Sequence, residues 1–202
     1  MEFDLRIVST FDASRGCRGD DFLPTYAAQL AAANTIVLTK LDRSNARESS
    51  EAGDSANGFN PLARQIVELD RAVRARSAFE GGMWGKPSRR SEFAAIAVAS
   101  PRIKIGFGRW PSATRWEDIG EWIENVSGYF GDRLLRMKGL VRPYGAESAL
   151  LINGVGGVFA TPRSIAVEND DELGLIMIAR DIEPDEFATA AGTTDGPEVS
   201  FR

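Results

Sequence analysis

The sequence predicts an α/β fold, with a partial parallel sheet in the first part of the chain and a small α+β domain in the second. A strand over 6–13, a helix over 24–33 and a strand over 35–39 follow one another with short joints. This strand–helix–strand order is typical of a parallel crossover. Later, several short strands surround one long amphipathic helix. We therefore expect two domains, over 1–85 and 91–191, and a disordered tail over 192–202.

Two further segments complete the first part of the chain. Residues 43–58 are rich in Ser, Asn, Glu and Gly, a composition that predicts a flexible loop. Asn60 and Pro61 are then expected to open a helix, with Asn as the cap and Pro in the first turn. The residues 85–90, Gly-Lys-Pro-Ser-Arg-Arg, are the predicted linker to the second domain.

The second part is predicted to contain strands over 93–99, 103–107, 134–141, 149–155 and 173–179, and a closing helix over 184–191. The residues 114–117, Thr-Arg-Trp-Glu, have the spacing of a capping box at the start of the long helix. The helix continues with an apolar stripe at helical spacing, formed by Ile119, Trp122, Ile123, Val126 and Phe130.

Composition limits the classes of partner. The chain has 202 residues, 43% of them hydrophobic and 26% charged, which is ordinary for a globular protein. Its net charge of -5 gives no reason to expect nucleic acid or an anionic membrane as a partner. No apolar run approaches the roughly 20 residues that span a bilayer, and the first residues are acidic. A cytoplasmic location is expected.

Cysteine and histidine counts exclude several chemistries. Cys17 is the only cysteine and the chain contains no histidine. A zinc site usually needs at least some sulfur or nitrogen ligands, so no zinc site is expected within this chain. Nucleophilic mechanisms that pair serine or cysteine with histidine are excluded for the same reason.

The most informative motif follows the strand over 35–39, where Thr39, Lys40 and Asp42 form a Thr-Lys-x-Asp string. In many GTPases the Asp carboxylate accepts hydrogen bonds from the ring N1–H and the exocyclic amine of guanine, and the Lys stem lies along the base. Such a two-point, charge-assisted contact is strong and selective. The competing interpretation is a polar junction between a strand and a loop. Asp12, at the end of the preceding strand, is a candidate magnesium-linked carboxylate, or else a solvated acid or a helix cap.

A triphosphate cradle is missing from the sequence. The P-loop pattern Gly-x-x-x-x-Gly-Lys-Ser/Thr lets backbone amides wrap the phosphates and a hydroxyl bind magnesium. The nearest string, over 80–87, begins with Glu80 where glycine is required and ends with Pro87, which has no hydroxyl. We therefore reject it as a P-loop.

Several segments together resemble the CobW family of P-loop GTPases, which are linked to cobalamin biosynthesis and to metal delivery. Residues 7–13 resemble the family's strand ending in Val-Asp-Ala, 29–42 its Gln…Thr-Lys-x-Asp stretch, and 59–63 its Leu-Asn-Pro-x-Ala segment. The most specific segment is 131–140, Gly-Asp-Arg-Leu-Leu-Arg-Met-Lys-Gly-Leu, which is close to the signature of the CobW C-terminal domain. Residues 153–155 and 178–181 match later stretches of that domain.

The resemblance implies a GTPase-like region joined to an intact CobW C-terminal domain. It assigns guanine recognition to Thr39, Lys40 and Asp42. The family's P-loop, switch regions and Cys-x-Cys-Cys metal motif lie upstream of the strand matched by 7–13. GTP and magnesium are therefore expected only together with a P-loop half, which would be a protein partner. The alternatives are a non-enzymatic interaction module, docking on a metalloprotein or a full-length CobW-family GTPase, and a residual fragment without an independent role.

Overall fold

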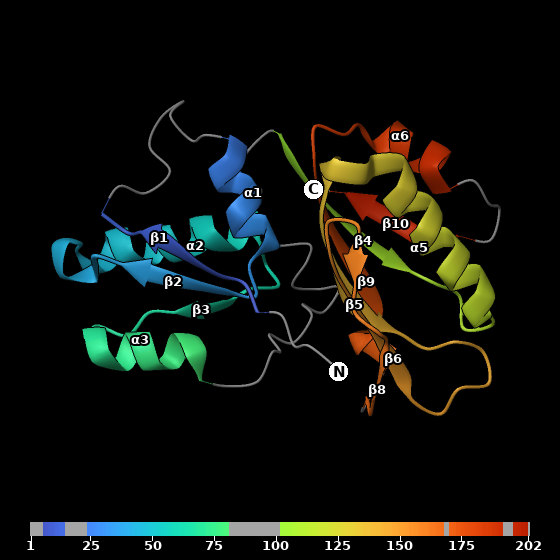
Figure 1. The fold of residues 1–202 in the computed structure, drawn as a ribbon, viewed down its shortest axis with the longest axis horizontal. Helices are drawn as coiled ribbons and strands as arrows, with labels where there is room; N and C mark the ends of the chain where they lie inside the picture. Colours follow the sequence, from blue (N-terminus) through green and yellow to red (C-terminus); the bar gives the residue numbers. More distant parts are fainter. Residues whose placement is uncertain (1–5, 15–23, 81–101, 168–169, 192–195, 202) are drawn as a thin grey trace. The chain divides into compact units, whose positions relative to one another are not determined.

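The computed structural model describes residues 6–14, 24–80, 102–167, 170–191 and 196–201, which fall into two compact units (Figure 1). Among these residues, those up to 80 form the first unit and those from 102 onward form the second. The first unit has a parallel sheet of three strands and the second an antiparallel sheet of seven. The predicted fold class is therefore confirmed. The predicted linker over 85–90 and the predicted strand over 93–99 lie outside the described residues.

Strands and helices alternate along the first unit, and its sheet has the order β1-β2-β3. Figure 1 shows α3 on one face of the sheet and α1 and α2 on the other. The elements are β1 (Val8–Asp12), α1 (Pro24–Ala32), β2 (Thr35–Thr39), the 3-10 turn η1 (Leu41–Arg43), α2 (Ala46–Phe59), β3 (Arg64–Ile66) and α3 (Arg71–Phe79).

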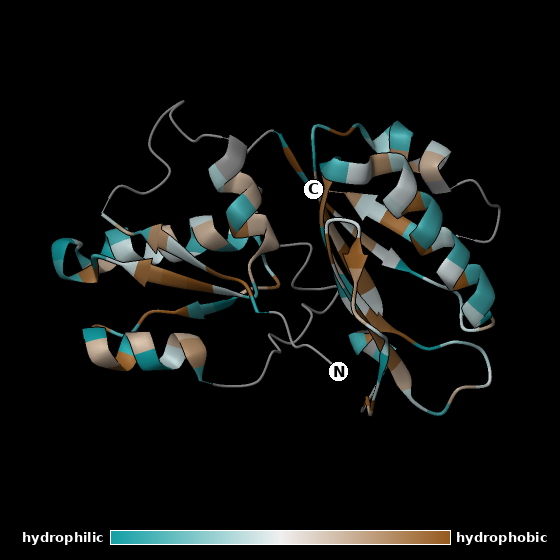
Figure 2. Ribbon diagram, viewed as in Figure 1, coloured by the Kyte–Doolittle hydropathy of each residue, from teal (hydrophilic) through white to brown (hydrophobic). Residues whose placement is uncertain are grey.

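The central strand β2 provides much of the core of this unit. Ile36 and Leu38 are fully buried, while Val37 packs with Ile66 and Ala78. A parallel strand covered by helices on both faces needs a continuous apolar run, which β2 has (Figure 2). The predicted parallel crossover is confirmed, because β1 and β2 pair in parallel.

Two predictions for the first unit are wrong. The segment expected to be a loop over 43–58 forms α2, because Asn45 and Glu48 make a capping box that satisfies backbone donors at the helix start. Asn60 does not open a helix. It is the buried residue that ends α2, and β3 follows it. The next helix, α3, is capped by Asp70.

The second unit is built around its antiparallel sheet, in the order β10-β4-β9-β5-β6-β7, with β8 paired to β6. Two helices, α5 and α6, lie on one face of the sheet (Figure 1). The elements are β4 (Ile103–Arg109), α5 (Trp116–Phe130), η2 (Gly131–Arg133), β5 (Leu134–Val141), β6 (Ala149–Val155), β7 (Val158–Phe159), β8 (Arg163–Ile165), η3 (Asp170–Glu172), β9 (Gly174–Arg180), α6 (Pro184–Ala191) and β10 (Glu198–Phe201).

The predicted apolar stripe of α5 is confirmed. All five of its residues are buried in one cluster with the sheet and with Phe187 of α6. The predicted capping box is wrong, because the Thr114 hydroxyl donates to the Pro111 carbonyl at 2.9 Å and α5 begins after Arg115.

The carboxyl-terminal tail is not disordered throughout. Residues 198–201 form β10, which pairs with β4, and its alternate residues Val199 and Phe201 pack against the core cluster. Four residues are too short a run for this alternation to predict a strand within a polar tail. None of the helices within the described residues is both long and apolar enough to cross a membrane.

Candidate functional site

The predicted site residues lie at one edge of the first unit, where β1 and β2 both end. In the parallel register, Asp12 of β1 is the partner of Thr39 of β2. Two hydrogen bonds join the strand ends: the Ala13 N–H donates to the Thr39 carbonyl at 3.0 Å, and the Thr39 hydroxyl donates to the Phe11 carbonyl at 3.2 Å. The carboxyl edge of a parallel sheet is where α/β proteins bind their ligands.

Lys40 turns back across this edge and pairs with Asp12. Its backbone has the left-handed conformation, with φ at 57°, and its Nζ lies 2.5 Å from the Asp12 Oδ2. The other carboxylate oxygen accepts from the Ser14 amide and hydroxyl, at 3.0 and 2.7 Å. Burial acts to raise the pKa of Asp12, but the hydrogen bonds from Lys40 and Ser14 hold it below its ordinary value. Asp12 is therefore an ionised carboxylate that is already paired with the Lys40 ammonium group.

Asp42, like Lys40, is exposed to solvent, but its side chain is not paired across the sheet edge with any described residue. It lies in η1, which is anchored by the buried side chain of Leu41 and by a hydrogen bond from the Arg43 N–H to the Lys40 carbonyl. Asp42 is exposed, and within the described part of the chain its carboxylate makes no hydrogen bond or ion pair. Its carboxylate is thus an acceptor that no donor among the described residues occupies.

The structure brings Asp12, Thr39 and Lys40 into direct contact and leaves Asp42 on the adjoining turn. Ser14 was missed by the sequence reasoning, although the Asp-x-Ser spacing of 12–14 is a known turn signal. As to metals, the described residues contain no group of three His, Cys, Asp or Glu side chains placed to hold an ion. Cys17 lies outside the described residues.

Comparison with known proteins gives one family match and two structural matches. Residues 109–191 match the family model for the cobalamin synthesis protein CobW C-terminal domain. The fold resembles that of the Zn(II)-bound YjiA GTPase from E. coli, with a TM-score of 0.65 and 20% identity over 92% of this chain. A Zn(II)-bound triple mutant of YjiA GTPase matches with a TM-score of 0.62 and 20% identity over 90% of this chain.

The chain spans 59% and 58% of the lengths of those two solved structures. A search of the curated proteins found no match. At 20% identity the structural matches establish a shared fold.

Proposed function

We propose that the two units of this chain have separate roles, nucleotide recognition and protein interaction. The chain carries the CobW C-terminal domain and shares the fold of YjiA, a CobW-family GTPase. In this proposal the first unit recognises guanine through Thr39, Lys40 and Asp42, and the second unit serves interaction with another protein. The family resemblance suggests metal delivery as the setting of that activity. The 202 residues would not hydrolyse GTP by themselves.

The observation that carries this proposal is the exposed Asp42 carboxylate at the carboxyl edge of the parallel sheet. Guanine presents two adjacent donors, its ring N1–H and its exocyclic amine, and one carboxylate can accept both. Adenine offers no such pair. The Lys40 side chain, which runs along the same edge to Asp12, supplies an extended stem against which a base can lie. Thr39 supports this arrangement by joining the ends of β1 and β2.

The same geometry argues against hydrolysis by this chain alone. Phosphoryl transfer depends on positioning and on electrostatic stabilisation of the transferred group. The sequence contains no Gly-x-x-x-x-Gly-Lys-Ser/Thr string, and Asp12, the candidate magnesium carboxylate, is held by Lys40 and Ser14. GTP and magnesium would therefore bind productively only when a phosphate cradle is supplied from outside these 202 residues.

Base recognition is tested by exchanging the acceptor for a donor. Asp42→Asn places an amide N–H where guanine donates, so guanosine binding should fall. Xanthosine, which has a carbonyl in place of the exocyclic amine, should then bind better than guanosine. The measurement is ligand-observed NMR at millimolar nucleoside, with adenosine as the negative ligand. Asp54→Ala, which removes an exposed carboxylate from α2, is the control and should change neither affinity. Equal binding of guanosine and adenosine by the unsubstituted chain would refute the assignment.

Hydrolysis is tested separately. The purified chain, incubated with GTP and magnesium, is expected to release no phosphate above the background of buffer alone. Phosphate release that disappears in Asp42→Asn would show that this chain is a complete GTPase and would overturn the second half of the proposal.

A second candidate function, an interaction module that needs no nucleotide, is favoured by a groove in the second unit. The groove has a volume of about 450 Å³ and runs along α5, with Ile152, Phe159 and Pro162 on its other side. Two glycines of α5 that line it, Gly120 and Gly128, would meet nothing within 4 Å if a Cβ were added. Glycine inside a helix costs about 1 kcal/mol relative to alanine, so open space at both positions suits the close approach of another backbone.

This second candidate is tested by filling the groove. Gly128→Trp should abolish association with a full-length CobW-family GTPase, measured by light scattering, while Asp42→Ala should leave it unchanged. If Asp42→Ala alone prevents association, the complex depends on the nucleotide edge, and the groove is not the docking surface.

A further inference from the structure

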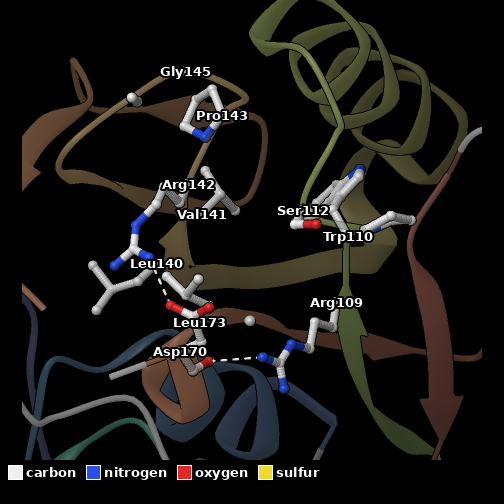
Figure 3. Close-up of a pocket in the computed structure, with 13 residues that line it drawn as sticks. Arg109, Trp110, Ser112, Leu140, Val141, Arg142, Pro143, Gly145, Asp170 and Leu173 are labelled. Atoms are coloured by element: carbon white, nitrogen blue, oxygen red, sulfur yellow. Dashed lines mark hydrogen bonds and ion pairs between the residues drawn. The ribbon is translucent and has the colours of Figure 1, made fainter. Parts of the chain in front are cut away.

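A cavity of about 410 Å³ lies at one end of the seven-stranded sheet, and all of its lining residues belong to the second unit (Figure 3). In the sheet order, β9 lies between β4 and β5 and is antiparallel to both. The beginning of β9 therefore meets the ends of β4 and β5. Arg109 ends β4, Arg142 follows β5, and Asp170 opens η3, just before β9.

Two arginines meet on one aspartate in this cavity. The Arg142 Nη1 donates to the Asp170 carboxylate at 2.6 Å, and the Arg109 Nη2 donates to the Asp170 main-chain carbonyl at 3.0 Å. Figure 3 shows the two guanidinium groups approaching Asp170 from opposite sides. A guanidinium has five N–H donors, and among the described residues each arginine uses only one of them. Asp170 is the only acid among the described residues that line the cavity, so the lining has a net positive charge.

The rest of the lining suits an organic ligand. Trp110, Leu140 and Leu173 supply apolar surface, and Ser112 supplies a hydroxyl. The volume falls within the range of about 300–1,000 Å³ that is usual for small-molecule sites. Arg142 Nε is buried without a hydrogen-bond partner in the described structure, which is a costly state for a charged donor. An anion that draws this guanidinium toward the cavity would give it partners.

We propose that this cavity binds a carboxylate attached to an apolar group, with Arg109 and Arg142 gripping the carboxylate. Arginine is suited to this task because its planar fork matches the two oxygens of a carboxylate. The Asp170 carboxylate already accepts a hydrogen bond from Arg142, so the carboxylate of the ligand competes with it for the Arg142 guanidinium. Two sources share this chemistry: a free organic acid and the C-terminal carboxylate of a peptide.

The experiment titrates the full chain with phenylacetate and, in parallel, with phenylacetamide, which has the same shape and no charge. Phenylacetate should bind saturably and phenylacetamide should not. Arg142→Gln and Arg109→Gln should each weaken binding about tenfold or more, since each removes a charge-assisted contact. Asp170→Asn should strengthen binding severalfold, because the ligand no longer displaces a carboxylate. A purely structural role for Asp170 would not produce this gain.

Controls separate the site from general charge effects. Arg115→Gln removes an exposed arginine directly before α5 that does not line the cavity and should leave the affinity unchanged. Arg142→Lys keeps the positive charge, and a folded Arg142→Lys variant should retain part of the affinity if Arg142→Gln fails to fold.

Two peptides distinguish the sources of the carboxylate. An acetylated tetrapeptide ending in phenylalanine is compared with the same peptide carrying a C-terminal amide. Tighter binding of the free-acid peptide than of phenylacetate assigns the cavity to a chain end, and the reverse order assigns it to a small acid. The proposal is overturned if neither acid binds, if the amides bind equally well, or if Arg142→Gln has no effect.

Discussion

At the scale of single residues, Asn60 is the main polar anchor of the first unit. Its side chain is fully buried, and its amide nitrogen lies within 3.0 Å of three carbonyls at the end of α1, those of Leu30, Ala31 and Ala33. Its carbonyl oxygen accepts from the Leu62 N–H at 3.0 Å. One side chain thus satisfies backbone groups from two separate segments, which a helix end otherwise leaves without partners.

Replacing Asn60 with alanine should lower the free energy of unfolding by about 3 kcal/mol, because three carbonyls and one buried N–H each lose a hydrogen bond. Urea unfolding followed by circular dichroism measures this change. Asn57→Ala, an exposed position on α2, is the matched control and should stay within about 0.5 kcal/mol. Similar losses for both variants would mean that Asn60 is not the anchor described above.

Two cations, Arg136 and Lys138, are buried in β5. The Arg136 guanidinium donates to the Gly154 carbonyl at 3.0 Å and to the Asn153 side chain at 2.8 Å. Burial lowers the pKa of Arg136 to about 10. Burial, with repulsion from Arg136, lowers the pKa of Lys138 to about 8. Both residues belong to the segment 131–140 on which the family resemblance rests, but no local pattern in that segment indicates that their charges are buried.

The pKa of Lys138 predicts how stability depends on pH. An unfolded lysine keeps its proton up to about pH 10.4, whereas folded Lys138 releases it near pH 8. Between these values the unfolded state binds more protons, so the free energy of unfolding should rise with pH, by roughly 3 kcal/mol over the interval. Chemical unfolding at pH 7.5 and 9.5 tests this rise.

Lys138→Met should remove most of the rise, whereas Lys104→Met, at a partly exposed position on β4, should keep it. Stability that stays level or falls from pH 8 to 10 in the unsubstituted chain would contradict the buried-lysine interpretation.

At the scale of elements, a helix could be predicted where its apolar residues form a regular pattern in the sequence, and not where they do not. The α5 helix was identified from its apolar stripe, because all its core contacts lie on one side. The α2 helix was mistaken for a loop because its residues are small and polar, and only Ala52, Ala56, Gly58 and Phe59 are buried. Its stability comes from packing and from the cap at Asn45, which composition alone does not reveal.

The pairing of β5 with β9 depends on a close approach that only glycine allows. A methyl group on Gly139 would overlap the Gly174 carbonyl oxygen of the neighbouring strand. Gly174 has a φ of 154°, and a Cβ there would collide with the Phe107 ring. Gly139 therefore allows β5 to approach β9 closely, and Gly174 allows the Phe107 ring to pack against the start of β9.

Gly139→Ala should reduce the free energy of unfolding by about 3 kcal/mol or more, since backbone atoms must move apart. Gly120→Ala, at an open position of α5, should instead raise it by up to about 1 kcal/mol through helix propensity. The two variants make the same chemical change in opposite environments, so thermal unfolding should shift in opposite directions. Destabilisation by both would show that the space beside α5 is filled.

At the scale of the whole molecule, the two candidate sites differ in how far the sequence could reveal them. The position of the candidate guanine edge could be predicted because its residues lie at, or just after, the ends of two adjacent parallel strands. The Asp12–Lys40 ion pair was not, since it depends on the left-handed turn at Lys40. The cavity of the second unit has no sequence motif, because Arg109, Arg142 and Asp170 come from three segments that are far apart in the sequence. Only the order of the antiparallel sheet brings them together.

The two units should also differ in stability. The sheet of the first unit has three strands, and within the described residues β1 pairs only with β2. Much of its buried apolar surface comes from alanines, such as Ala27, Ala31, Ala52 and Ala56. The second unit buries Trp122, Phe130 and Phe187 against seven strands. Since apolar burial is the main stabilising term, the first unit should unfold at the lower urea concentration.

Tryptophan fluorescence can isolate the second unit in a Trp84→Phe variant, because Trp84 belongs to the first unit and the other three tryptophans, Trp110, Trp116 and Trp122, belong to the second. Far-ultraviolet circular dichroism reports the helices of both units. During a urea titration the dichroism should begin to change before the fluorescence does. Asn60→Ala, in the first unit, should shift only the early transition, and Gly139→Ala only the late one. If the two signals instead change at the same urea concentration, and both shift together in each variant, the chain unfolds as one cooperative body. In two independent units, a substitution in one unit would leave the midpoint of the other unchanged.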